Sequence, residues 1–202
     1  MKKFTILTSK IVPLFIEDID TDQIIPSRFL KETKREKCVK NFFRDWRYNE
    51  DGTLKKDCIF NNSIFSGQIL LVGRNFGCGS SREHAVWAII DYGFKAIISS
   101  FFADIFKENA LNNGLLLVEV SDIFLKTLFN QVKTCPHTNI IINLIKQIIL
   151  IVETKKYEKF YIHPYRKNCF INGYDDLTFL VSMKQEIKNF EKKRSFFNFL
   201  KK

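Results

Sequence analysis

The segment that decides the fold of this chain reads Gly73-Arg74-Asn75-Phe76-Gly77-Cys78-Gly79-Ser80-Ser81-Arg82-Glu83-His84. It follows the apolar run 69–72, which predicts a buried strand, and it precedes 85–90, which predicts a helix. A strand-to-helix turn of this kind presents free backbone N–H groups that attract anions. Arg82 adds a planar guanidinium suited to a carboxylate. Ser80, held among the same donors, could act as a base or a nucleophile.

Three well-known glycine or serine motifs do not fit this turn. The dinucleotide-binding fingerprint needs glycine where Arg82 stands, the phosphate-binding loop needs Gly-Lys-Ser/Thr, and the hydrolase elbow needs Gly-x-Ser-x-Gly. A purely structural turn would need only one capping hydroxyl, whereas two adjacent serines and an arginine stand here. The pattern therefore indicates a carboxylate-binding site.

Three neighbouring features each allow a functional and a structural interpretation. Ser80 and His84 are four residues apart, which would place them on one helical face, but packing is the favoured role of the histidine. Cys78 could be a thiol nucleophile near a helix start, but a small residue tolerated at a tight turn is favoured. The run 20–22, Asp-Thr-Asp, taken alone indicates a polar turn.

Alternating strand and helix patterns follow the glycine turn. We expect strands at 69–72, 95–99 and 115–120, and helices to Tyr92, over 103–112 and from Ser121 to about 132. This alternation predicts an α/β fold with a parallel, right-handed βαβ core. Residues 4–15 predict one or two strands broken near Ser9-Lys10, and Ser27 is expected to cap a short helix.

The second half of the chain adds antiparallel strands and helices. The runs 139–145 and 148–153 predict an antiparallel pair, and 160–162 a further strand. A helix is expected over 164–172, ending at Gly173, and a final helix from about Leu177 carries a basic tail. We expect one domain over 1–202, with 177–202 as its C-terminal basic helix and tail.

Composition limits the classes of function. The net charge of +10 raises a nucleic-acid hypothesis, but the lysines are scattered and no stacking motif accompanies them, so no nucleic-acid partner is expected. Five cysteines, an odd number with no close pair, argue against a disulfide framework, a zinc ribbon or an iron–sulfur cluster bound by this chain alone. We expect no metal site in this chain. No apolar signal segment or membrane span is found, so a cytoplasmic protein is expected.

Six segments, taken in order, resemble one family. They are 20–26, 41–47, 75–84, 92–95, 103–106 and 169–173. In this respect the chain is similar, from about residue 4 to 178, to the small subunits of isopropylmalate isomerase (3-isopropylmalate dehydratase). Val86 departs from the proline that bacterial members often carry. The resemblance implies a three-layer β/β/α domain equivalent to the swivelling domain of aconitase, with a parallel βαβ core and added antiparallel strands.

The resemblance also implies a reaction, a cofactor and a partner. The family's hydro-lyases interconvert 2-isopropylmalate and 3-isopropylmalate by dehydration and rehydration through isopropylmaleate, in leucine biosynthesis. A [4Fe–4S] cluster carried by a separate large subunit would act as the Lewis acid. The small chain would then bind no cofactor of its own, and a heterodimer or higher assembly would be needed for activity on the dicarboxylic acid.

Site residues follow from the same motifs. By similarity to aconitase, Ser80 would be the base that removes the proton. Ser81 and Arg82 would hold a substrate carboxylate, Asp22 would match an acidic active-site position, and Arg28 would be a second carboxylate contact. Gly77 and Gly79 would shape the turn. Selection of an isopropyl group needs an apolar pocket, for which Phe29 and Leu30 are candidates, unless this loop packs against the large subunit. Two other hypotheses stay open: a related dehydratase acting on homoaconitate or citraconate-type diacids, and a basic module that binds phosphate or nucleic acid.

Overall fold

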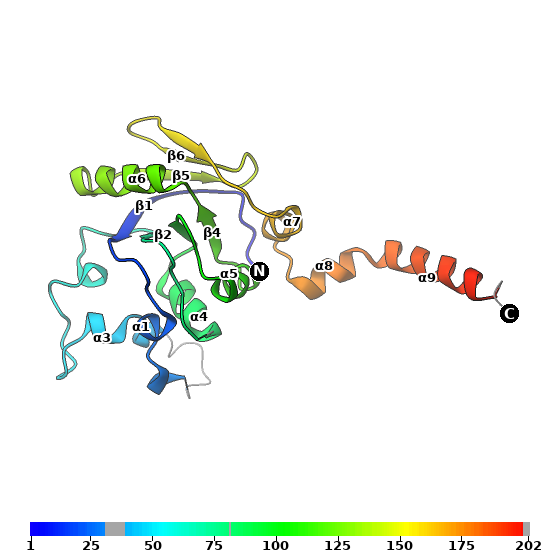
Figure 1. Ribbon diagram of the computed structural model, residues 1–202, viewed down its shortest axis with the longest axis horizontal. Helices are drawn as coiled ribbons and strands as arrows, with labels where there is room; N and C mark the ends of the chain where they lie inside the picture. The colour runs from blue at the N-terminus through cyan, green and yellow to red at the C-terminus, as the bar shows by residue number, and fades with distance from the viewer. Residues whose placement is uncertain (31–38, 81, 200–202) are drawn as a thin grey trace.

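The computed structural model describes residues 1–30, 39–80 and 82–199, and it shows a single seven-stranded mixed sheet (Figure 1). The strands lie in the order β4-β3-β2-β1-β5-β6-β7, and β1 to β4 are parallel while β5, β6 and β7 continue the sheet antiparallel. The strands are β1 Ile6–Leu14, β2 Ile69–Val72, β3 Ala96–Ser99, β4 Leu116–Glu119, β5 Asn139–Asn143, β6 Ile148–Ile151 and β7 Tyr157–Lys159.

Helices cover both faces of the parallel strands. The helices of the described residues include α1 Thr21–Ile24, η1 Ser27–Phe29, α3 Arg44–Arg47, η2 Ile59–Asn61, α4 Glu83–Tyr92, α5 Asp104–Asn112, α6 Asp122–Thr134, α7 Pro164–Asn172, α8 Asp176–Ser182 and α9 Lys184–Phe199. The helices α1, α4 and α5 pack on one face. On the other face, α6 and α7 share a hydrophobic cluster with β5 and β6 (Figure 1). The predicted α/β class, parallel core and added antiparallel strands are confirmed.

Strand β2 is apolar without interruption because both of its faces are buried. In β2, Leu70 and Val72 point into the cluster beneath α4 and α5, whereas Ile69 and Leu71 point into the cluster beneath α6. Alternate side chains of a strand face opposite sides, so a strand covered on both sides has no side chain that faces solvent. This arrangement places the carboxyl ends of β1 to β4 along one edge of the sheet.

Helix boundaries follow the signals in the sequence. Gly93 ends α4 with φ 119°, Gly173 ends α7 with φ 76°, and the Ser121 hydroxyl accepts a hydrogen bond from Phe124 N at the start of α6. Glycine tolerates the left-handed conformation that closes a helix, and serine oxygen satisfies a free N–H at the start. These predicted helix ends are confirmed.

Three predicted boundaries are wrong. Strand β1 is continuous through Ser9-Lys10, because this is where its neighbour changes: residues up to Lys10 pair with β5, and those from Ile11 pair with β2. The strand predicted at 160–162 lies at Tyr157–Lys159 instead; Phe160 and Ile162 are buried core residues beyond the paired segment. The predicted final helix is divided into α8 and α9 at Met183.

Candidate active site

The glycine turn lies at the carboxyl ends of β1 and β2, where the two chain segments continue side by side. Gly77 N donates to Ile19 O at 2.7 Å, and Thr21 N donates to Cys78 O at 3.0 Å. Parallel pairing thus extends beyond both strands up to the start of α1. This pairing brings the Asp20–Asp22 segment against Ser80 of the turn, although the two are about sixty residues apart in sequence.

Gly77 and Gly79 give the turn its shape. Both have φ +81°, a conformation that side chains disfavour. A Cβ on Gly77 would lie 2.2 Å from Cγ of the buried Phe106 ring, and one on Gly79 would lie 3.3 Å from Cβ of Asp20. Backbone conformation and close packing therefore both require glycine at Gly77, and the conformation alone disfavours any other residue at Gly79.

Ser80 is fixed by its backbone and exposed at its side chain. The buried Thr21 hydroxyl donates to the Ser80 carbonyl at 2.5 Å, which ties the end of the turn to α1. Ser80 itself is exposed to solvent, and its hydroxyl has no hydrogen-bond partner among the described residues. The Ser80 backbone is thus held in place, and the side chain is accessible to a ligand.

Arg82 and Asp22, predicted separately as ligands of the substrate, contact each other. Arg82 Nη1 lies 2.5 Å from Asp22 Oδ1, and the same oxygen accepts a hydrogen bond from Ser27 N at 2.8 Å. The Ser27 N–H, together with the Arg82 guanidinium, holds the pKa of the Asp22 carboxyl below its usual value. Asp22 Oδ1 thus accepts its hydrogen bond from the residue that begins η1. Because η1 begins at Ser27 and Pro26 is its cap, the prediction that Ser27 caps this short helix is wrong.

Arg28 lies in η1 and is paired with an aspartate that the sequence analysis did not single out. Its two terminal nitrogens contact both carboxylate oxygens of Asp45 in α3, with Nη1–Oδ2 at 3.1 Å. Asp45 raises the pKa of the Arg28 guanidinium. Both side chains are more than half exposed, so this ion pair can exchange with a ligand at little cost.

The predicted apolar pocket around Phe29 and Leu30 takes a different form. Both side chains pack against the core beside α4. Phe29 also lines a cavity of about 540 Å³ whose other walls include Arg28, Arg44 and Glu50, so that cavity is largely polar.

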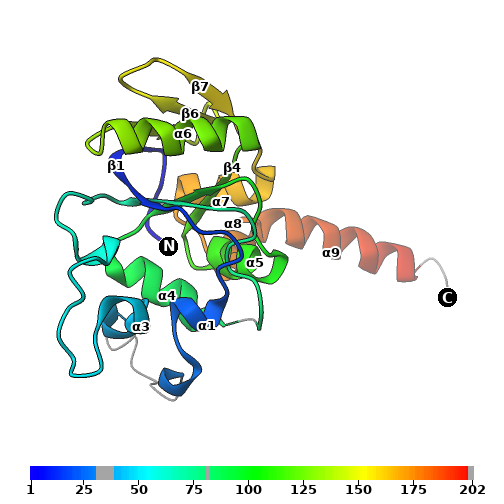
Figure 2. The same cartoon turned by 60° about the vertical axis from the view of Figure 1, so that its left-hand side comes forward.

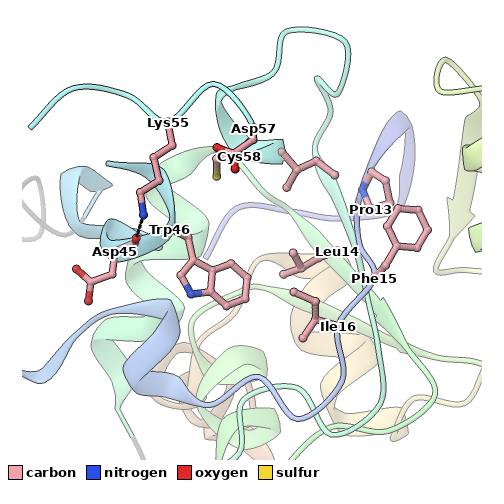
Figure 3. Close-up of a pocket in the computed structure, with 10 residues that line it drawn as sticks. Pro13, Leu14, Phe15, Ile16, Asp45, Trp46, Lys55, Asp57 and Cys58 are labelled. Carbon is pink, nitrogen blue, oxygen red and sulfur yellow. Dashed lines mark hydrogen bonds between the residues drawn. The ribbon is translucent and has the colours of Figure 1, made fainter. Parts of the chain in front are cut away.

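A more apolar cavity lies at the end of β1. Its volume is about 520 Å³, and in Figure 3 the Trp46 ring faces Leu14 and Ile16 across it. Asp45 stands at the rim, where its carbonyl accepts a hydrogen bond from Lys55 Nζ at 2.9 Å. Leu14 and Trp46 come from segments that are distant in sequence, so no local pattern signals this cavity.

Three further predicted residues have different outcomes. Ser81 lies outside the described residues. Helix α4 begins at Glu83, so Ser80 precedes the helix and does not share a helical face with His84; that prediction is wrong. His84 packs against Trp87 with ring centroids 4.8 Å apart, in agreement with the packing role.

Cys78 is a turn residue with an unreactive environment. Its Sγ lies 3.4 Å from the carbonyl oxygen of Asp18, and burial, together with the nearby Asp20 and Asp18 charges, raises the pKa of the thiol. A raised pKa disfavours the thiolate, the nucleophilic form. Across residues 1–30, 39–80 and 82–199, no group of three or more His, Cys, Asp or Glu side chains could hold a metal ion. The described residues therefore do not fit an iron–sulfur cluster.

Comparison with known proteins identifies the family. Residues 1–123 match the model of the aconitase C-terminal domain. The 3-isopropylmalate dehydratase small subunit of Cytophaga hutchinsonii is 54% identical over 200 residues, which cover 99% of this chain and 100% of that protein. This chain belongs to the 3-isopropylmalate dehydratase small-subunit family.

Two further proteins support the assignment. The protein of that name from Karelsulcia muelleri is 54% identical over 193 residues, covering 96% of this chain and 98% of its own length. The crystal structure of a 3-isopropylmalate dehydratase from Methanocaldococcus jannaschii superposes with a TM-score of 0.66 at 26% identity, covering 91% of this chain and 98% of that one. The resemblance deduced from the motifs is confirmed.

Proposed function

We propose that this chain is the small subunit of a 3-isopropylmalate dehydratase, with Ser80 as its catalytic base. The hydro-lyase interconverts 2-isopropylmalate and 3-isopropylmalate through isopropylmaleate in leucine biosynthesis, and the small subunit acts with a large one. Three curated small subunits, each 54% identical over nearly the whole of this chain, support the assignment of this reaction. Ser80 is exposed, and the Thr21 hydroxyl holds its backbone carbonyl in place; both observations support a role of Ser80 in binding and catalysis.

The chain's own residues account for the proton transfer. Dehydration removes a proton from one carbon and hydroxide from its neighbour. Rehydration adds hydroxide to the carbon that lost the proton and a proton to the carbon that lost the hydroxide. Ser80 Oγ would accept the proton from the carbon next to a carboxylate. A serine oxygen can do so only where fixed donors stabilise its alkoxide, and we infer that N–H groups in the first turn of α4 and the Arg82 guanidinium would act as these donors.

Substrate binding is assigned to the two arginines. Arg82 donates one N–H to Asp22, and its guanidinium has four further N–H donors. These are enough to bind a substrate carboxylate while the bond to Asp22 stays in place. Arg28 would take the second carboxylate by exchange with Asp45. Ser81 follows Ser80 in the motif and is proposed as a further carboxylate ligand on that basis alone.

The partner would be a large subunit that carries the [4Fe–4S] cluster, in a cytoplasmic heterodimer or higher assembly. The name of the relatives, small subunit, supports a second, larger chain. No described helix is long and apolar enough to cross a membrane. Under this proposal the purified small subunit is colourless and inactive by itself.

The test is reconstitution with the large subunit and assay of isopropylmalate isomerisation. Ser80→Ala should lower kcat by roughly 10²–10⁴-fold with little change in KM, the effect expected for loss of a general base. Ser63→Ala is the matched control, because Ser63 is also an exposed serine and is not part of the proposed site. Equal kcat values for Ser80→Ala and Ser63→Ala would show that Ser80 is not the base. Faster turnover of another diacid than of isopropylmalate would show that the substrate is that other diacid.

A further inference from the structure

The C-terminal arm, defined as α8 with α9, leaves the body of the protein beyond α7 in both views (Figures 1 and 2). Its base is fixed to α7, because Tyr165 donates a hydrogen bond to Asp176 Oδ1 at 2.5 Å and packs edge-on against Phe179. Beyond this contact, every residue from 180 to 194 is exposed. A helix that projects into water is only marginally stable by itself. Packing of the arm against another surface would therefore stabilise it.

One face of the arm carries an apolar stripe. Leu180, Met183, Ile187 and Phe190 are 55%, 37%, 41% and 63% exposed, and their spacing of three, four and three residues is that of the a and d positions of a coiled coil. The stripe crosses the junction of the two helices, where Ile187 N donates to Met183 O at 3.0 Å. It therefore forms one candidate seam for a second helix.

Charged residues flank the stripe in a balanced pattern. Lys184 and Glu191 occupy the e positions on one side, and Glu186 and Lys193 occupy the g positions on the other. All four are exposed, and none belongs to an ion pair within residues 1–30, 39–80 and 82–199. Each flank thus offers one acid and one base, and charges at these positions set partner choice and helix orientation.

The positions of these charges select one arrangement. In a parallel pair, Glu186 of one arm would face Glu191 of the other, which is repulsive. In an antiparallel pair about a two-fold axis, Ile187 packs against Phe190 of the other arm, and Met183 packs against the aliphatic stem of Arg194. Lys184 then faces Glu191, and Glu186 faces Lys193, and symmetry repeats each contact. We propose that the arm pairs antiparallel with the arm of a second copy of this chain, through an isologous two-fold interface.

The net positive charge of the chain does not prevent this pairing. Lys188 and Lys192 occupy the b and f positions, which point away from the seam, so solvent and salt screen their repulsion. An acidic partner chain would be favoured instead by flanks that are basic on both sides, and the flanks of this stripe are mixed. The self-complementary pattern therefore favours a second copy over a different protein.

A charge exchange tests the pairing in the full-length chain, by sedimentation velocity over a concentration series. The wild-type chain should dimerise reversibly. Glu186→Lys and Lys193→Glu should each raise the dimer Kd at least roughly tenfold, because each places like charges together twice. The double variant, E186K with K193E, should restore the dimer. Lys188→Glu, with the same change in charge outside the seam, should not weaken it.

Ile187→Asp provides a second test that is independent of the flanking charges. It should make the chain monomeric, while circular dichroism and urea unfolding show that the body remains folded. A monomeric wild-type chain, or a double variant no tighter than the single ones, would overturn the proposal. So would a large subunit that dissociates the dimer and whose own binding is abolished by Ile187→Asp, because the arm would then dock on that subunit.

Discussion

Replacing Gly77 with alanine tests how the turn is held. At φ +81° an alanine costs roughly 1–2 kcal/mol in backbone conformation. Its Cβ would also lie 2.2 Å from Cγ of Phe106, a ring that is only 2% exposed and cannot move into solvent. Overpacking of this kind costs about 1–3 kcal/mol, so we expect a total loss of about 2–5 kcal/mol in the free energy of unfolding.

Gly52→Ala is the matched control. Gly52 has φ +84°, and no atom lies within 4 Å of the position of its Cβ, so only the conformational cost applies. The smaller entropy of the unfolded chain is common to both variants and cancels in the comparison. Urea unfolding of the two variants should therefore differ by roughly 1–3 kcal/mol at unchanged slope. Equal losses would refute the argument that packing against Phe106 fixes the turn.

Two further predictions concern groups around the site. The pKa of Asp22 is lowered in the folded state, so its contribution to stability is present above its ordinary value of 3.8 and is lost as the pH falls through the folded value. Between about pH 6 and about pH 3 the wild-type chain should lose more free energy of unfolding than Asp22→Asn, and an equal or smaller loss would contradict the pairing with Ser27 and Arg82. Ser99→Ala should cost about 1–3 kcal/mol, because the buried hydroxyl donates to Gly73 O at 2.8 Å. Thr127→Ala, which removes an exposed hydroxyl bonded within a helix, should change stability by no more than about 0.5 kcal/mol, and a similar loss in both would rule out a special role of the Ser99 bond.

The sequence was sufficient for the elements whose signals are local. The apolar run at β2, the glycine at the end of α4 and the serine at the start of α6 each act within a few residues, and the structure confirms them. The polar centre of β1, Ser9-Lys10, predicts a break in the strand, but in the structure it marks the point where the neighbouring strand changes. Which strand lies beside which depends on the whole sheet, and no local pattern records it.

The same division applies to the candidate site. Ser80, Arg82 and the two glycines could be predicted from one segment, since a strand, a glycine turn and a helix start define a site for an anion without any distant contact. Only the tertiary structure decided that Asp22 accepts hydrogen bonds from both Arg82 and Ser27 N, and that Arg28 forms an ion pair with Asp45. Ion pairs between segments that are about twenty to sixty residues apart depend on how the chain is packed, and packing is a property of the complete fold rather than of any one stretch of it.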